Sequence, residues 1–323
     1  MGRRFKGLPV TPDPTPLQSE TLRIGTRGSP LALAQAGETR RRLAAALRRP
    51  EATIEIVPVR TTGDRITDRP LSEAGGKGLF TKEIDEALLE GRVDFAGHSA
   101  KDLPTALPDG IAIAACLERA DVRDAFLSPV AASLAALPRG ARLGTSSLRR
   151  RAMALRLRPD LAVIDMRGNV ETRLAKLAAG VADATLLAAA GLTRLGLLDR
   201  ATSLIEVDGW LPAAGQGVIA IAARTDDAAV RAALATIDHA ETHAALLAER
   251  AFLGVLDGSC RTPIGGLARI EGGTLHFRGT IVKPDGSEAH DAARSGPVAD
   301  ATLIGADAGA ELKRRGGAGF FAG

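Results

Sequence analysis

The feature that most constrains the fold of this chain is a regular alternation of short apolar runs with helix-like segments, which begins at Thr21. Strands are predicted at TLRIG, ATIEIVPVR and VDFAGHSA, and helices are predicted at SPLALAQAGETRRRLAAALRR and TKEIDEALLEGR. Strands that alternate with helices in this way form sheets with helices on both faces. The sequence therefore predicts an α/β fold whose sheets are mainly parallel.

The alternation starts again at ARLGTSS, and this second block predicts a second α/β lobe that faces the first across a cleft. After His239 the pattern changes, because a long Ala/Leu helix to Leu256 precedes three strand-like runs and a last helix. A chain of 323 residues is also long for a single core. We therefore predict an N-terminal extension (residues 1–20) that is Pro-rich and disordered, two α/β lobes, and a smaller α+β unit from about His239 onward.

Composition argues against several classes of protein. Aromatic residues make up 3% of the chain and Tyr is absent, so few rings are present on which nucleic-acid bases could stack, and the net charge is only +4. No apolar run approaches the roughly 20 residues that span a bilayer, and the first residues lack the apolar core of a secretory signal. The two cysteines lie far apart, as is usual in a reducing compartment. We therefore expect a cytoplasmic protein that binds neither nucleic acid nor membranes.

Arginines recur where a predicted strand ends and a helix begins. Arg27 lies in TRGSP, Arg149 and Arg150 follow GTSS, Arg167 lies in MRGN, and Arg173 lies one turn further on. Ligands of α/β sheets collect at this edge, where helix N-termini point free N–H groups and guanidinium groups match carboxylates or phosphates. The pattern predicts a site for anions, and a solvated basic face is the alternative for any single arginine.

The stretch GHSAKDLP follows a predicted strand and places Lys101 beside Asp102. A carboxylate next to a lysine at a strand end can stabilise a developing cation or take up a proton. The alternative is that Asp102 is only a turn residue before Leu-Pro. The local pattern leaves both interpretations open.

Nucleotide and metal motifs find no support. GGKGLFTKE lacks the spacing of a phosphate-binding loop, and LPAAGQGVIAI shares only its glycines with a dinucleotide fingerprint and precedes its strand. The five histidines are scattered, and no Cys/His pair has the spacing of a zinc site. We therefore expect no metal ion.

The two cysteines have different surroundings. Cys116 ends the apolar run IAIAAC, which indicates a buried core residue. Cys260 lies in the polar stretch DGSCRTPIGG, where the neighbouring Arg261 could favour the reactive thiolate. From these residues alone, a structural role for Cys260 is the alternative to a reactive one.

Ten stretches together resemble the porphobilinogen deaminase family, in the order and at the spacing of that family. They cover nearly all of the chain from Leu22 and read RIGTRGSPLALAQA, GGKGLFTKEID, GHSAKDLP, DVRDAFLS, LGTSSLRRRA, RGNVETRLAKL, LAAAGLTRLG, LPAAGQGVIAI, AERAFL and GSCRTPIG. With this resemblance we predict three domains, of which domains 1 and 2 are similar to the two lobes of a periplasmic binding protein. Their bounds are 21–117 and 217–237 for α/β domain 1, 118–216 for α/β domain 2, and 238–323 for the smaller α+β domain 3. The resemblance also implies a monomer.

The resemblance implies a specific chemistry for Cys260 and Asp102. In this family the loop cysteine carries a dipyrromethane cofactor through a thioether bond, and that position falls on Cys260. Four porphobilinogen units add in turn to this primer, each with loss of ammonia, and hydrolysis releases 1-hydroxymethylbilane for tetrapyrrole (porphyrin, heme) biosynthesis. The family's catalytic aspartate falls on Asp102, which would stabilise the cationic azafulvene left when ammonia departs and help to move pyrrole protons.

The resemblance also implies which side chains bind the acetate and propionate groups of the pyrroles. Cofactor-binding roles fall on Lys101, Ser147, Arg149, Arg150 and Arg173. Substrate-binding roles fall on Arg27, Ser29, Arg167, Arg194 and Lys77, the last in a loop expected to be mobile.

Two other classes of function stay open beside this transferase. One is a two-lobed receptor or sensor that binds a small dicarboxylate reversibly and forms no covalent adduct. The other is a thiol-dependent hydrolase, which needs a histidine base near Cys260, and His239 and His243 are the candidates.

Overall fold

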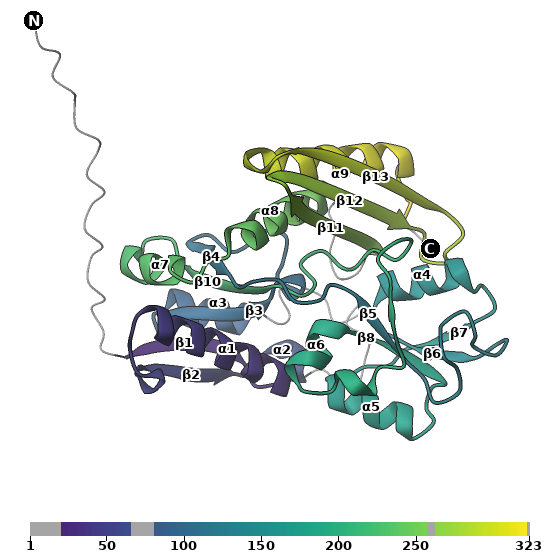
Figure 1. Cartoon of the computed structure of the whole chain (residues 1–323), viewed down its shortest axis with the longest axis horizontal. Coiled ribbons are helices and arrows are strands. Elements are labelled where there is room, and N and C mark those ends of the chain that lie inside the picture. Colours follow the sequence, from purple (N-terminus) through teal and green to yellow (C-terminus); the bar gives the residue numbers. More distant parts are fainter. Residues whose placement is uncertain (1–20, 66–80, 257–261, 322–323) are drawn as a thin grey trace, which may run out of the picture.

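Three sheets organise the chain, each with its own helices (Figure 1). The computed structural model describes residues 21–65, 81–256 and 262–321. The predicted N-terminal extension therefore lies outside the described residues, as do Lys77 and Cys260. Within the described ranges, no helix is both long and apolar enough to cross a membrane.

The first lobe is a five-stranded sheet with the strand order β2-β1-β3-β10-β4. Its strands are β1 (Leu22–Arg27), β2 (Ile54–Val59), β3 (Phe95–Ser99), β4 (Ile111–Cys116) and β10 (Ile219–Arg224). Its helices are α1 (Pro30–Ala46), α2 (Thr62–Arg65), α3 (Lys82–Leu89) and α7 (Ala228–Ala235), with the short 3₁₀ helices η1 (Glu51–Thr53) and η2 (Ala100–Asp102). Successive residues of a strand point to opposite faces. Accordingly, Ile221 joins the core cluster of α1 and α7, and Ala222 joins the cluster of α3, so helices cover both faces.

The second lobe repeats this plan with the strand order β7-β6-β8-β5-β9. Its strands are β5 (Asp124–Leu127), β6 (Arg142–Gly144), β7 (Ala162–Ile164), β8 (Ala184–Ala188) and β9 (Ser203–Ile205). Its helices are α4 (Leu148–Leu157), α5 (Val170–Ala178), α6 (Ala189–Arg194) and the 3₁₀ helix η3 (Leu198–Arg200). Phe126 of β5 packs in the cluster that contains Met153 of α4, while its neighbour Ala125 packs with Leu177 of α5 and Leu192 of α6.

Both sheets are mixed, whereas the sequence pattern predicted mainly parallel sheets. β10 pairs antiparallel with β3 and β4, and β5 pairs antiparallel with β8 and β9. Two segments connect the lobes: the first crossing (residues 117–123) and the second crossing (residues 206–218). β5 follows directly after the first crossing, and β10 follows directly after the second. The predicted boundaries at 117/118 and 216/217 fall within these crossings, and the predicted domain bounds stay a prediction.

The C-terminal unit is an antiparallel sheet covered by two helices, in agreement with the predicted α+β unit (Figure 1). It consists of α8 (Ala240–Val255), β11 (Ile264–Glu271), β12 (Thr274–Val282), β13 (Ala289–Pro297), η4 (Val298–Asp300) and α9 (Ala301–Gly316). Phe252 of α8 lies against Phe277 of β12, with 4.9 Å between the ring centroids. Buried residues of α9, among them Ala308 and Leu312, complete the same core.

A buried acid on α8 ties this unit to both crossings. Glu249 is fully buried and accepts hydrogen bonds from Nη2 of Arg119 at 3.1 Å, the amide of Gly215 at 2.6 Å and the amide of Ala268 at 2.8 Å. Arg119 lies on the first crossing and Gly215 on the second. A single carboxylate therefore fixes the C-terminal unit to the hinge region of the two lobes.

The two helices of the C-terminal unit approach each other closely at Gly305 of α9. A Cβ atom built there would lie 1.9 Å from the carbonyl oxygen of Ala248 on α8. Backbone atoms cannot yield as a flexible side chain does, so this position requires the absence of a side chain. Gly254, also helical, has no atom within 4 Å of such a Cβ.

We expect Gly305→Ala and Gly254→Ala to change stability in opposite directions. Gly305→Ala forces α8 and α9 apart and should lower the free energy of unfolding by about 1–3 kcal/mol. Gly254→Ala adds helix propensity in open space and should raise it by about 0.5–1 kcal/mol. Urea unfolding followed by circular dichroism measures both. Equal effects of the two substitutions would contradict the close approach of α8 and α9.

Candidate active site between the two lobes

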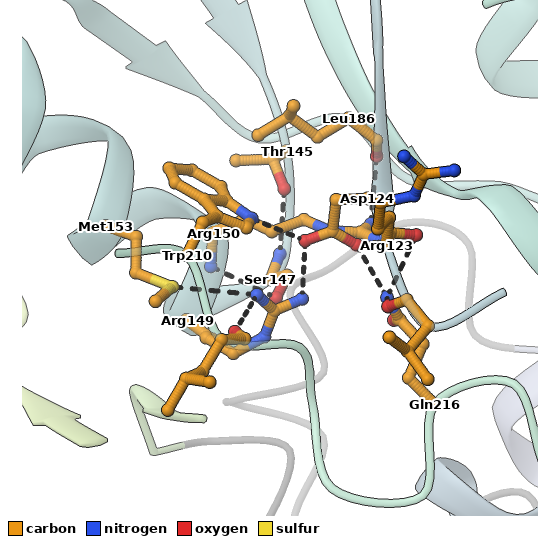
Figure 2. A network of polar contacts seen from close by, with 12 residues as sticks. Arg123, Asp124, Thr145, Ser147, Arg149, Arg150, Met153, Leu186, Trp210 and Gln216 are labelled. Carbon is orange, nitrogen blue, oxygen red and sulfur yellow. Dashed lines mark hydrogen bonds and ion pairs between the residues drawn. The ribbon is translucent and has the colours of Figure 1, made fainter. Parts of the chain in front are cut away.

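The centre of the candidate site is one buried carboxylate, Asp124, at the start of β5. It accepts hydrogen bonds from Nη2 of Arg149 at 2.8 Å, Nη2 of Arg150 at 2.7 Å, the indole nitrogen of Trp210 at 2.8 Å and the side-chain nitrogen Nε2 of Gln216 at 2.9 Å (Figure 2). Burial opposes its charged form, but the two arginines and the other donors outweigh burial and hold the pKa of Asp124 well below its usual range. Asp124 is therefore a buried anion paired with two cations.

The arginine pair is positioned by the start of α4. Ser147 caps this helix, and its hydroxyl accepts a hydrogen bond from the backbone amide of Arg150. Arg149 also donates to the carbonyl of Leu211 at 2.9 Å, and Arg150 donates to the carbonyl of Leu186 at 2.9 Å. Both arginines are buried, and two guanidinium groups face one carboxylate. The cluster consequently keeps an excess of positive charge.

Some donors of this cluster lack an acceptor. Nε of Arg149, Nε of Arg150 and the hydroxyl of Ser146 are buried and have no hydrogen-bond partner among the described residues. Buried polar atoms in native proteins are almost always paired, because an unmade hydrogen bond is costly there. These atoms are therefore suited to a ligand that brings acceptor oxygens.

Lys101 and Asp102 of the first lobe lie next to this cluster, in the 3₁₀ turn η2 that follows β3. The ammonium of Lys101 donates to the side-chain oxygen of Gln216 at 3.3 Å. Burial and the positive charge of Arg150 lower the pKa of Lys101 to about 8, and the charge of Asp102 opposes that shift. Asp102 itself is exposed. Lys101 is consequently a cation held close to Arg150 of the second lobe.

Arg173 of α5 approaches the same carboxylate from the second lobe. Burial and the charges of Arg150 and Arg167 lower its pKa to about 10, while Asp102 acts in the opposite direction. Nε of Arg173 donates to the carbonyl of Gly168 at 2.9 Å. The exposed carboxylate of Asp102 therefore interacts with a cation from each lobe, Lys101 and Arg173.

A small cavity of the first lobe adjoins Asp102. It is lined by Arg27, Ser29, Leu31, Ala32, Gln35, Thr81, Gly97, His98, Ser99 and Asp102. Burial and the charge of Arg27 lower the pKa of His98 to about 4, so this imidazole is neutral near pH 7. Nε2 of His98 is buried without a partner among the described residues. The cavity thus combines a cation and hydroxyl donors with Asp102.

Arg194 has protein partners at the contact between the lobes. Its Nη2 donates to the carbonyl of Gly217 at 2.9 Å, and its Nε lies 3.6 Å from a carboxylate oxygen of Glu38 on α1. Burial lowers its pKa. Arg194 therefore joins α6 of the second lobe to the first lobe.

The predicted site residues fall into groups. Arg27, Ser29 and Asp102 share the cavity, and Ser147, Arg149 and Arg150 surround Asp124. Lys101 connects the groups through Gln216, and Arg173 and Arg167 act on them electrostatically. Cys260 and Lys77 lie outside the described residues. Cys116 is a free, fully buried thiol with its pKa raised to about 12 by burial, which confirms its predicted place in the core.

The histidines considered for thiol hydrolysis have other partners. Nδ1 of His239 caps α8 through Thr242, with 2.9 Å to its hydroxyl and 3.2 Å to its amide. Nδ1 of His243 lies 3.0 Å from a carboxylate oxygen of Asp238. Nδ1 of both imidazoles is therefore engaged at the start of α8, and Cys260, the thiol of the hydrolase alternative, lies outside the described residues.

Sequence reasoning missed three members of the cluster. Asp124 lies in DVRDAF, part of which is predicted as a strand, and Gln216 lies in LPAAGQGVIAI, a stretch that resembles the family but in which no residue was given a role. Trp210 is the single tryptophan of the chain and its indole reaches Asp124. Two features of the sequence could have pointed to these residues: Trp210 is the only tryptophan, and Asp124 is an acidic residue at the start of an apolar strand.

Fold and site together define a two-lobed α/β protein with a cationic binding site between its lobes. The family model "Porphobilinogen deaminase, dipyromethane cofactor binding domain" matches residues 22–232, and "Porphobilinogen deaminase, C-terminal domain" matches residues 243–314. The chain belongs to the porphobilinogen deaminase family. Membership of this family makes it a transferase of tetrapyrrole biosynthesis that carries a domain for binding a dipyrromethane cofactor.

Curated relatives agree with this assignment. The chain is 61% identical to the porphobilinogen deaminase of Nitrobacter hamburgensis over 298 residues, which covers 92% of this chain and 94% of that protein. It is 59% identical to that of Nitrobacter winogradskyi over the same shares. A periplasmic substrate-binding protein of an ABC transporter from Coxiella burnetii is similar in structure over 67% of this chain and 92% of that chain, with 17% identity and a TM-score of 0.41.

We expect Asp124→Asn to destabilise the protein strongly. The substitution leaves two buried guanidinium groups without a counter-charge, which costs about 3–5 kcal/mol of unfolding free energy. The control is Asp208→Asn, because Asp208 pairs with Arg278 at an exposed position and its loss should leave stability unchanged. Chemical unfolding at pH 7 measures both variants.

The same substitution should alter the response to acid. The pKa of Asp124 is lower in the folded state than in the unfolded state, where it is about 3.9. The ionised carboxylate therefore contributes fully to the free energy of unfolding above this value, and the contribution is lost as the pH falls below it. Between about pH 5 and pH 3, the wild type should lose more unfolding free energy than Asp124→Asn. Parallel stability curves over this range would contradict an ionised, buried Asp124.

Proposed function

We propose that this chain catalyses the stepwise deaminating condensation of four porphobilinogen molecules onto a dipyrromethane primer attached to Cys260, followed by hydrolysis that releases 1-hydroxymethylbilane and ammonia. The observation that carries the proposal is the position of Asp102. It is an exposed carboxylate that interacts with cations of both lobes, Lys101 and Arg173. Such a carboxylate suits a reaction in which a positive charge develops on a substrate held by cations.

The unpartnered donors of the arginine cluster fit a dipyrromethane group. Nε of Arg149 and Nε of Arg150 are buried donors beside an excess of positive charge, and the acetate and propionate groups of a dipyrromethane are anionic acceptors. When bound, the group supplies the terminal pyrrole ring to which the next ring is added. The residues that would hold it are Cys260, Lys101, Ser147, Arg149, Arg150 and Arg173.

The substrate side of the site is assigned to the first lobe and its border. Arg27 and Ser29 line the cavity beside Asp102, so they are placed to bind a carboxylate of porphobilinogen while its aminomethyl group faces Asp102. Arg167 lies near Arg173 and would extend this anion site. Lys77 completes the proposed set, together with Arg194. Arg194 would act from the lobe contact, since its guanidinium already binds Gly217 and Glu38.

Asp102 has two tasks in this scheme. Loss of ammonia leaves a cationic pyrrole on the substrate, and the negative charge of Asp102 stabilises that cation. After the new carbon–carbon bond forms, a proton must leave the pyrrole ring, and an exposed carboxylate can accept it and pass it to water. Lys101 and Arg173 orient the carboxylates of the rings around it.

The setting of the reaction is also part of the proposal. We place the enzyme in the cytoplasm as a monomer that acts on a small molecule and needs no metal ion. A free, buried Cys116 is in keeping with a reducing compartment.

We expect Asp102→Asn to abolish turnover while the fold and the covalent adduct remain. Because Asp102 is exposed, its loss should leave the melting temperature near that of the wild type. The rate of porphobilinogen consumption should fall at least about 100-fold, since a charge needed in the transition state is removed. Asp109→Asn, an exposed aspartate of the same lobe, serves as the control. Near-normal turnover of Asp102→Asn would exclude the role given to Asp102.

A further inference from the structure

Gln216 connects the two crossings between the lobes to the turn that carries Lys101 and Asp102. Its side chain is fully buried, and its Nε2 donates to the carbonyl of Val122 at 2.8 Å and to Oδ1 of Asp124 at 2.9 Å. Its Oε1 accepts the hydrogen bond from Lys101 at 3.3 Å. Gln216 lies on the second crossing and Val122 on the first.

The direction of this amide is fixed by its neighbours. An amide nitrogen only donates and an amide oxygen only accepts. The carbonyl of Val122 and the carboxylate of Asp124 are both acceptors, so they select the nitrogen of Gln216. A flipped amide would place its oxygen against two acceptors and its nitrogen against an ammonium group. Asp124 therefore directs the oxygen of Gln216 toward Lys101.

The ammonium of Lys101 depends on this oxygen. Lys101 is surrounded by charges of both signs: Arg149 and Arg150 disfavour its charged form, whereas Asp102 and Asp124 favour it. Burial disfavours the charged form further. A hydrogen bond to the charged form of a group favours that form. The amide oxygen thus stabilises a cation that the arginine pair destabilises.

We propose that Gln216 is a positioning residue, which holds the ammonium of Lys101 charged and aimed at the junction of the two lobes, beside Asp102. Its carboxamide contacts Asp124 of the buried arginine cluster on one side and Lys101 of the first-lobe turn on the other, so it fixes Lys101 relative to the cluster. The ammonium has three donor hydrogens, so one can bind Gln216 while the others bind a carboxylate of a ligand. Only the identity of that ligand rests on the proposed function.

Two substitutions test this role. Gln216→Met keeps a similar length and removes both the donor and the acceptor. Gln216→Glu keeps an oxygen facing Lys101. If Gln216 only fastened the two crossings together, Gln216→Met would leave the titration of Lys101 unchanged, whereas the new negative charge of Gln216→Glu raises the midpoint in either case. If it positions Lys101, the Met variant lowers the titration midpoint and the Glu variant keeps it at or above the wild-type value.

The test is the pH dependence of Lys101 acetylation in the purified full-length protein. Acetic anhydride reacts with the uncharged amine, and mass spectrometry of the peptide that contains Lys101 reports its extent. We expect a midpoint in Gln216→Met about one pH unit below the wild type, a tenfold change in proton affinity. The value of kcat/KM at pH 8 should fall about tenfold in the same variant and recover in part in Gln216→Glu.

Gln35→Met is the matched control. Gln35 is another buried amide of the first lobe, but its Nε2 binds the hydroxyl of Ser99 at 2.8 Å and not Lys101. Its loss should leave the Lys101 midpoint unchanged. A wild-type midpoint in Gln216→Met overturns the proposal, whatever happens to stability. If that variant does not fold, Gln216→Leu, which also lacks the donor and the acceptor, replaces it, and a wild-type midpoint in that variant overturns the proposal. Because acetylation needs no substrate, the Lys101 midpoint can be measured and interpreted even if the protein lacks the proposed catalytic activity.

Discussion

The ion pairs of Asp124 with Arg149 and Arg150 are the interaction on which the site depends. Two guanidinium groups lie buried at the start of α4, and a buried charge is tolerated only when a counter-charge and hydrogen bonds replace water. Asp124 supplies both, and the indole of Trp210 and the amide of Gln216 complete its shell. One carboxylate cannot neutralise two cations, so the cluster keeps a positive charge in surroundings with little water. This excess positive charge favours the binding of an anionic ligand.

The same carboxylate links the chemistry to the architecture. Asp124 is the first residue of β5, the strand that enters the second lobe directly from the first crossing, and Gln216 lies on the return crossing. Through Gln216 the cluster reaches Lys101, whose neighbour Asp102 is the exposed acid of the site. Glu249 anchors the C-terminal unit to these same crossings. A fixed hinge region therefore sets the relative positions of the cations, the acid and α8, the helix that ends shortly before Cys260 in the sequence.

The sequence allowed much of this to be predicted, and the failures have physical causes. The βα alternation predicted two lobes, and the arginines at strand ends predicted an anion site, because both depend on local patterns. The partner of Arg149 and Arg150 could not be found this way, since Asp124 is about 25 residues away and looks like part of a strand. Gln216 was not singled out, because the glycines beside it dominate the motif and its partners lie far away in the sequence. The antiparallel direction of β10 follows from the path of the chain between lobes, which a local pattern does not encode.

The central claim is that this cationic site serves a pyrrole chain covalently attached to Cys260. The most direct test is the intact mass of the purified protein beside that of Cys260→Ser. The account predicts a wild-type mass raised by two condensed pyrrole units and a Cys260→Ser mass equal to the bare chain. An adduct that persists in Cys260→Ser, or a wild type that stays unmodified even after incubation with porphobilinogen, would contradict it.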